Sequence, residues 1–125
     1  MYIDKPVKRV IILGATRPEP SLEKEMEVRG IKVQWARTIG DAAALLNSGA
    51  NRTVIVSEVA LTDGNWRDLI EHVRRRSIPV LLVSSTRTAD LWWDALDCGV
   101  DDILVSPLSS SRLCEYLEKQ FTKQK

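Results

Sequence analysis

The residue in this chain best placed to do chemistry is Glu58, which follows an apolar run at residues 53–57 and precedes an Asp63-Gly64 pair. The run predicts a buried strand, and the Asp-Gly pair predicts a turn. In α/β proteins the ligand crevice lies at the carboxyl ends of the strands, so a carboxylate there is a candidate for a functional role. The competing interpretation is a solvated acid at a strand end with no role of its own.

Two arginines are candidates for a partner of Glu58. Arg17 follows the first apolar run of the chain, and Arg87 follows the fourth. A guanidinium group pairs well with a carboxylate, so either side chain could fill a site beside Glu58. Loop arginines more commonly extend into water, and the sequence slightly favours that alternative.

The adjacent residues Trp92 and Trp93 are the candidates for an interface. They lie in a predicted helix, where neighbouring side chains point about 100° apart, so both can hardly be fully buried. We expect one indole to face the core and the other to be exposed, as tryptophan anchors at protein interfaces are. The alternative is that both pack partly against neighbouring helices.

These residues are positioned by strand-like and helix-like segments that alternate five times along the chain. The predicted strands lie at residues 9–13, 31–36, 53–57, 80–83 and 100–105. The predicted helices lie at residues 21–29, 38–47, 66–75 and 88–98 and, after Pro107, through residues 113–121. This alternation with short connections predicts an α/β fold, a three-layer sandwich in which helices cover both faces of a five-stranded parallel sheet. Periodicity alone does not give the strand order.

Composition limits the classes of function. The 125 residues predict a single domain with its core at about residues 8–122, and a net charge of +1 predicts neither a nucleic-acid nor a membrane partner. The longest apolar runs are too short to span a bilayer, and the first residues have no signal-peptide pattern. Cys98 and Cys114 fit no metal-ligand spacing, so we expect a cytoplasmic chain with reduced thiols and without a metal or cofactor.

Three stretches resemble the receiver domains of response regulators, the CheY-like superfamily. Residues 95–107 (ALDCGVDDILVSP) resemble the end of the fourth receiver helix and the following strand, the region around Glu58 resembles the third strand, and residues 79–85 resemble the fourth. The likeness extends from about Val10 to Phe121. It implies a flavodoxin-like sheet with strand order 2-1-3-4-5 and a place in two-component, phosphorelay signal transduction.

The resemblance also implies where the phosphorylation site of the family falls. The two acids that help to hold Mg²⁺ fall on Gly14 and Ala15, and the phosphoryl-accepting aspartate falls on Glu58. Neither Gly14 nor Ala15 has a side chain that binds a metal. Phosphoryl transfer depends on electrostatic stabilisation of the transferred group, so the loss of these acids argues against Mg²⁺-dependent phosphorylation.

The remaining positions of the family's phosphorylation site also differ from the family residues, with one exception. The hydroxyl at the end of the fourth strand is retained as Ser84, whereas the lysine at the end of the fifth falls on Ser106 and the switch aromatic falls on Ile103. The sequence therefore predicts a degenerate, pseudo-receiver site in which Glu58 is a fixed charge. Because a carboxylate carries less charge than a phosphate, Glu58 would imitate the phosphorylated state only in part.

The predicted function is an atypical receiver domain that is not an enzyme and acts by protein-protein interaction. The expected partner is a histidine kinase, an output protein or a second copy of the chain, bound through the face from the fourth to the fifth helix. An alternative from another class is a small-molecule or nucleotide-binding flavodoxin-like module. A third is a receiver with unusual chemistry on Glu58 or Ser57.

Overall fold

The apolar segments form one parallel sheet in the computed structural model, which describes residues 8–47, 52–85, 88–106 and 109–123. Its strands are β1 (Lys8–Leu13), β2 (Ile31–Ala36), β3 (Arg52–Glu58), β6 (Val80–Ser84) and β7 (Asp102–Val105). They are arranged in the order β2-β1-β3-β6-β7. Counted along the chain, this is the order 2-1-3-4-5 that the resemblance implies.

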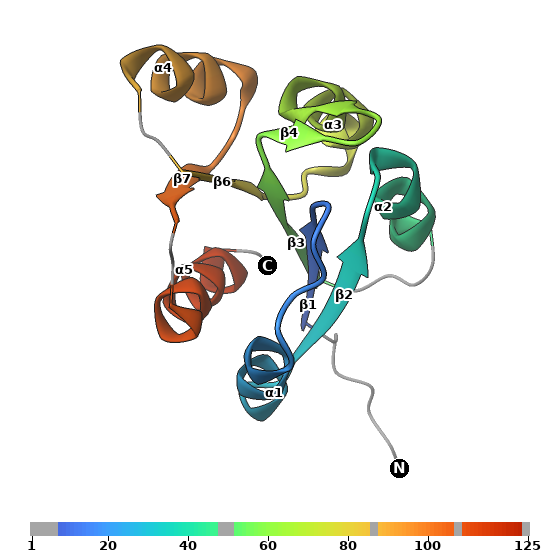
Figure 1. Cartoon of the computed structure of the whole chain (residues 1–125), viewed down its shortest axis with the longest axis vertical. Helices are drawn as coiled ribbons and strands as arrows, with labels where there is room; N and C mark the ends of the chain where they lie inside the picture. Colours follow the sequence, from blue (N-terminus) through green and yellow to red (C-terminus); the bar gives the residue numbers. More distant parts are fainter. Residues whose placement is uncertain (1–7, 48–51, 86–87, 107–108, 124–125) are drawn as a thin grey trace.

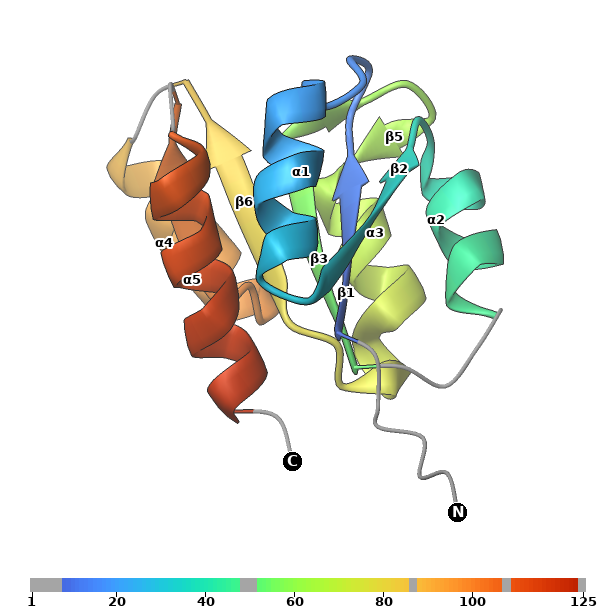
Figure 2. The same ribbon diagram turned by 90° about the horizontal axis from the view of Figure 1, so that it is seen from below.

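Helices cover both faces of the sheet, as the alternating pattern predicts. Helices α1 (Pro20–Val28) and α5 (Ser110–Lys123) lie on one face, and α2 (Ile39–Leu46), α3 (Trp66–Val73) and α4 (Ala89–Cys98) lie on the other (Figure 1). Seen from below, α1 and α5 stand in front of the sheet and α3 behind it (Figure 2). The molecule is therefore the predicted α/β/α sandwich.

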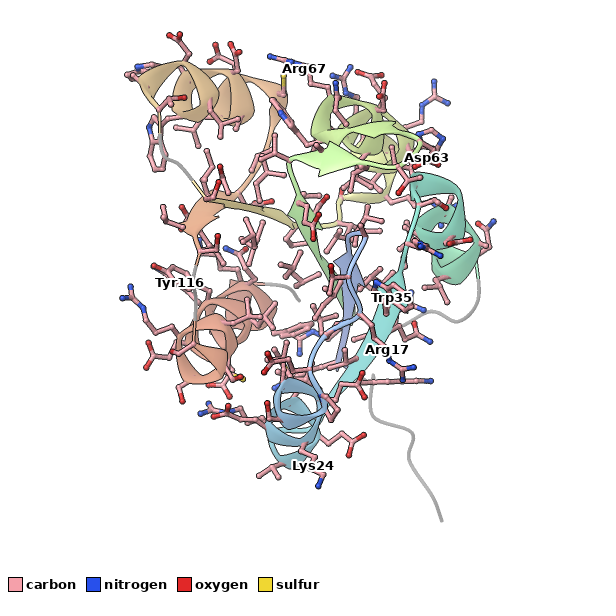
Figure 3. All side chains as sticks on the ribbon, viewed as in Figure 1. Arg17, Lys24, Trp35, Asp63, Arg67 and Tyr116 are labelled. Carbon is pink, nitrogen blue, oxygen red and sulfur yellow. The ribbon has the colours of Figure 1, made fainter. Side chains whose placement is uncertain are left out.

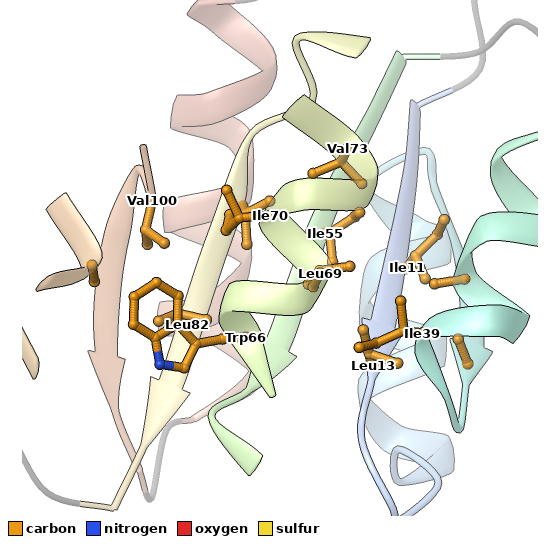
Figure 4. Packing of buried hydrophobic residues seen from close by; sticks show 14 of the residues in the cluster. Ile11, Leu13, Ile39, Ile55, Trp66, Leu69, Ile70, Val73, Leu82 and Val100 are labelled. Carbon is orange, nitrogen blue, oxygen red and sulfur yellow. The ribbon is translucent and has the colours of Figure 1, made fainter. Parts of the chain in front are cut away.

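Each face of the sheet has its own hydrophobic core because successive residues of a strand point to opposite faces. On β1, Ile11 and Leu13 join the cluster under α2, α3 and α4, whereas Val10 joins the cluster under α1 and α5. The first cluster includes the buried side of α3, which packs on the strands as Figure 4 shows. In the second, the Cys114 and Met26 sulfur atoms are 3.7 Å apart.

The segment between β3 and α3 has more regular structure than the turn predicted at Asp63-Gly64. It forms a two-stranded antiparallel hairpin of β4 (Ala60–Leu61) and β5 (Gly64–Asn65), with the predicted turn between them. Asn65 then begins α3 with a capping box, in which its side chain accepts a hydrogen bond from the Asp68 backbone and the Asp68 side chain accepts one from the Asn65 backbone. The helix ends earlier than predicted, in a short 3₁₀ turn, η1 (Arg74–Arg76).

Candidate functional site

Glu58 is the last residue of β3, at the carboxyl edge of the sheet. It is paired in register with Val83 of β6, and its side chain is exposed. The preceding Ser57 is fully buried, and its hydroxyl donates a hydrogen bond to the Glu58 carbonyl oxygen at 2.8 Å. The strand thus holds the Glu58 backbone in place while the carboxylate remains at the surface.

Gly14 lies directly beneath the Glu58 side chain. Its backbone is held from β2: the Gly14 N–H donates to the Ala36 carbonyl at 3.0 Å, and the Gly14 carbonyl accepts a hydrogen bond from Trp35 Nε1 at 3.0 Å. A Cβ atom added at Gly14 would lie 2.5 Å from Glu58 Oε1 and 2.7 Å from its Cδ. The Glu58 side chain therefore occupies the space that any side chain at position 14 would require.

Ala15 and Arg17 follow Gly14 in the loop after β1, and both are exposed. The Arg17 side chain is 72% exposed, and its Nε lies 3.9 Å from Glu23 Oε1 of α1. Figure 3 shows Arg17 beside the loop that leads into α1. In the structure Arg17 therefore faces Glu23 of α1, and the hypothesis that it fills the site beside Glu58 stays a prediction. Arg87 lies outside the described residues.

The two serines at the neighbouring strand ends are joined through the backbone. The Ser106 N–H, just after β7, donates to the carbonyl oxygen of Ser84 at the end of β6 at 2.9 Å. Both side chains are partly buried. Ile103, in contrast, is 4% exposed and belongs to the core beneath α2, α3 and α4. The structure thus brings Ser84 and Ser106 to the carboxyl edge and places Ile103 in the core.

A hollow of about 240 Å³ opens at this edge of the sheet, on the side of α1 and α5. Its described lining is mostly apolar and includes one charged residue, Glu58: Ile12, Leu13, Pro18, Leu22, Val56, Ser57, Glu58, Val83, Ser106 and Leu113. Glu58 and Ser106 thus line the same hollow, as do Leu22 of α1 and Leu113 of α5. Neither periodicity nor a motif in the sequence predicts this hollow.

Asp63, five residues after Glu58, lies at the turn of the β4–β5 hairpin. Its Oδ1 accepts a hydrogen bond from the Ile39 N–H at 2.8 Å, and its Oδ2 accepts one from the Gly40 N–H at 3.2 Å. These groups are at the start of α2, next to the Asp63 label in Figure 3. The hydrogen bond from Ile39, and then that from Gly40, lowers the pKa of the Asp63 carboxyl.

Solved structures of response regulators have the same fold as this chain. A two-component response regulator from Clostridium difficile superposes with a TM-score of 0.78 at 20% identity, over 93% of this chain and 97% of that protein. The non-phosphorylated HemR receiver domain from Leptospira biflexa gives 0.76 at 22% identity, over 97% and 98% of the two chains. This chain has the receiver-domain fold.

A sequence comparison points in the same direction over a shorter stretch. Regulator of RpoS from Escherichia coli K12 is 26% identical over an alignment of 98 positions, and the match covers 70% of this chain and 29% of that protein. The counterpart from Shigella flexneri matches equally. This chain thus spans less than a third of the length of these relatives. No protein-family model matches the sequence.

On this receiver fold, the two tryptophans of α4 have the different surroundings that the helix geometry predicts. Trp92 is partly buried against the core, whereas Trp93 is 64% exposed. Leu96, three residues after Trp93 and hence on the same side of the helix, is 38% exposed. Val105 of the edge strand β7 is 40% exposed. The prediction of one core-facing and one exposed indole is confirmed.

One contact of the receiver fold that sequence reasoning missed joins α3 to α4. The Arg67 guanidinium lies over the ring of Trp66, 4.7 Å from its centroid, and donates to Asp94 Oδ2 at 2.7 Å. Trp66 is 2% exposed and caps the core next to the hairpin. The three residues belong to two helices far apart in the sequence, so no local pattern indicates their contact.

The described part of the receiver fold contains no group of three or more His, Cys, Asp or Glu side chains placed to hold a metal ion. None of the helices in the same ranges is both long and apolar enough to cross a membrane.

Proposed function

We propose that this chain is a receiver-type module of two-component signalling that acts through protein-protein contacts and is not phosphorylated by the Mg²⁺-dependent aspartyl route. The observation that carries the proposal is the position of Glu58 over Gly14, with 2.5 Å between its Oε1 and the place of a Cβ at Gly14. The likeness to receiver structures and to Regulator of RpoS supports the signalling role.

The charges at the site are unfavourable for phosphorylation. A phosphoryl group brings about 1.5–2 negative charges, which a metal ion and a cationic side chain must neutralise in the transition state. At the corresponding positions this chain has Gly14, Ala15 and Ser106, none of which carries a charge. Glu58 keeps the negative charge of the aspartate that the family has at this position, without the metal-binding acids and the lysine that accompany it there. The site therefore opposes the reaction that the family performs.

Glu58 acts in this proposal as a permanent charge, independent of a kinase. In the described residues its carboxylate contacts neither a cation nor a hydrogen-bond donor, so none of these residues reads the charge as a lysine would. The imitation of a phosphorylated aspartate is therefore weak. A nucleotide-binding role has less support, because the apolar hollow and the Glu58 carboxylate would disfavour phosphate groups.

The partner surface that we propose is centred on Trp93 and Leu96 of α4. In Figure 1 the edge strand β7 lies between α4 on one face and α5 on the other. Exposed indoles are favoured as interface anchors because they bury much apolar area with few rotatable bonds. A histidine kinase, an output protein or a second copy of the chain would bind at this face, and the proposed role needs no catalysis.

The phosphorylation half of the proposal is tested by mass. The purified domain is incubated with Mg²⁺ and acetyl phosphate, and its intact mass is compared with that of the variant Gly14→Asp/Ala15→Asp/Glu58→Asp/Ser106→Lys, which restores the family residues. We expect the mass of the natural chain to remain unchanged. A stoichiometric acyl-phosphate adduct on the natural chain would overturn the proposal, whatever the variant does.

The interaction half is tested by substitution at the surface. Trp93→Ser removes the exposed indole of α4, and Val28→Ser, at a residue that is 88% exposed at the end of α1, is the matched control. Proteins retained from a native lysate, and self-association measured by sedimentation, should be lost in Trp93→Ser and kept in Val28→Ser. Equal retention by the natural chain and both variants would contradict the proposed surface.

A further inference from the structure

The hollow beside Glu58 has the properties of a small amphipathic site. Seven of its ten described lining residues are apolar, and they come from β1, β3, β6, α1, α5 and the loop before α1. Its volume is about 240 Å³. Pockets for drug-sized ligands have volumes of about 300–1,000 Å³, so this hollow suits a smaller molecule with a short hydrocarbon chain.

The charge at the hollow favours a cation. Glu58 is the one charged residue of the described lining, and its carboxylate has no ion pair or hydrogen bond with the described residues. Arg17 pairs with Glu23 instead. The Ser57 hydroxyl, which could donate to an anion, already donates to the Glu58 carbonyl. A carboxylate beside an apolar wall attracts an ammonium or guanidinium group more strongly than it would in open water.

Glu58 also has a close backbone neighbour. Its side chain lies over Gly14, whose backbone is fixed from β2 by Ala36 and by the Trp35 indole. A carboxylate that packs against backbone has fewer alternative positions than one on an open helix, so less conformational entropy is lost when a ligand binds. The hollow thus combines an apolar wall with one positioned negative charge.

We propose that this hollow binds an alkylammonium group, with the ammonium on the Glu58 carboxylate and the aliphatic chain between Leu22, Val56 and Leu113. The inference goes beyond the proposed signalling function and does not depend on the α4 surface. Two sources carry this chemistry: a free aliphatic amine and the side chain of a lysine. Both are charged at pH 7, because the pKa of an alkyl ammonium is about 10.4.

The test is a titration of the ¹⁵N-labelled chain, followed by NMR, with four probes. Pentylamine represents the free amine, and N-acetyl-lysine methylamide represents the lysine side chain. Pentanol and pentanoate are the matched neutral and anionic controls. We expect saturable shifts of the Gly14, Glu58 and Ser106 amides, with a dissociation constant on the order of 0.1–1 mM for a ligand of this size.

Two variants and one control locate the binding. Glu58→Gln keeps the shape and removes the charge, so it should weaken pentylamine binding about tenfold. Ser106→Lys supplies a tethered ammonium to the same hollow and should abolish pentylamine binding. Glu27→Gln, at an exposed residue of α1 outside the hollow, should bind as the natural chain does. Thermal unfolding by circular dichroism confirms that each variant is folded.

Every outcome decides the inference. Binding of both amines supports it with lysine as an accessible source, and binding of pentylamine alone supports it with a free amine as the source. The absence of saturable shifts, pentanoate binding as tight as pentylamine binding, or equal binding by the natural chain and Glu58→Gln would overturn it. Because the α4 surface is not altered, failure here leaves the proposed signalling function standing.

Discussion

Glu58 and Asp63 are two carboxylates five residues apart in the chain, and their surroundings differ completely. Asp63 accepts hydrogen bonds from the backbone N–H groups of Ile39 and Gly40. Glu58 lies over a glycine beside an apolar hollow, without a polar partner in the described part of the chain. The comparison indicates that one acid stabilises the fold, whereas the other leaves its charge available to a ligand.

The β4–β5 hairpin produces this difference. It begins directly after β3 and carries Asp63 across to the first turn of α2, where the unpaired N–H groups and the helix dipole stabilise a negative charge. The Thr38 hydroxyl accepts a hydrogen bond from the Asp41 N–H in the same turn of α2. The first N–H groups of the helix thus donate to two side chains, those of Asp63 and Thr38. Glu58 precedes the hairpin and remains at the edge of the sheet.

The largest expected effect comes from removing each carboxylate in turn. Asp63→Ala leaves two N–H groups of α2 without their acceptor and releases the hairpin from the helix, so it should lower Tm by about 3–6 °C. Glu58→Ala removes no polar contact with the described residues and should change Tm by less than about 2 °C. Differential scanning calorimetry of the two variants and the natural chain measures both effects. Equal losses would show that Glu58 has a structural partner.

The Asp63 carboxyl also makes the stability of the chain depend on pH. The pKa of Asp63 is lower in the folded chain than its ordinary value of about 3.9, because Ile39 and Gly40 donate to the ionised form. The unfolded chain therefore binds more protons below about pH 4, and the stability from Asp63 is present above that pH and lost as pH falls through the lowered folded pKa.

Urea unfolding between pH 2 and pH 6 measures this dependence. Asp63→Asn cannot ionise and should flatten the acid limb of the stability curve, whereas Glu58→Gln serves as the matched control. The prediction is wrong if Asp63→Asn keeps the acid limb of the natural chain.

Much of this organisation could be predicted from the sequence, because it depends on local patterns. The apolar run before Glu58 predicts the strand, and the helix geometry around Trp92 and Trp93 predicts one buried and one exposed indole. The strand order required the family resemblance, since periodicity specifies which face of a strand is buried but not which strand is its neighbour.

The contacts that the sequence did not predict are long-range. Asp63 contacts Ile39, 24 residues earlier, and the chain between them contains α2 and β3. The local signal at Asp63-Gly64 indicated a turn, which is present, but a turn does not specify what its side chain caps. The ion pair of Arg17 with Glu23 is more local, and no pattern in the sequence distinguished it from the hypothesised contact with Glu58.

The smallest expected effect concerns the contact between the Glu58 side chain and Gly14. Gly14 is not among the described glycines with positive φ, and a Cβ there would meet the movable end of Glu58, so Gly14→Ala is compatible with the backbone. In a Glu58→Ala background it should stabilise the chain by about 0.4–1 kcal/mol, because alanine reduces the freedom of the unfolded state.

In the natural chain the same substitution must first displace the Glu58 carboxylate, so the gain should be cancelled. The four proteins form a double-mutant cycle, and urea unfolding should give a coupling free energy of about 0.5–1 kcal/mol between positions 14 and 58. The Gly14→Ala chain should also bind pentylamine more weakly while remaining fully folded. A coupling near zero would mean that Glu58 leaves Gly14 at no cost, and that the carboxylate is no better positioned than any other exposed acid.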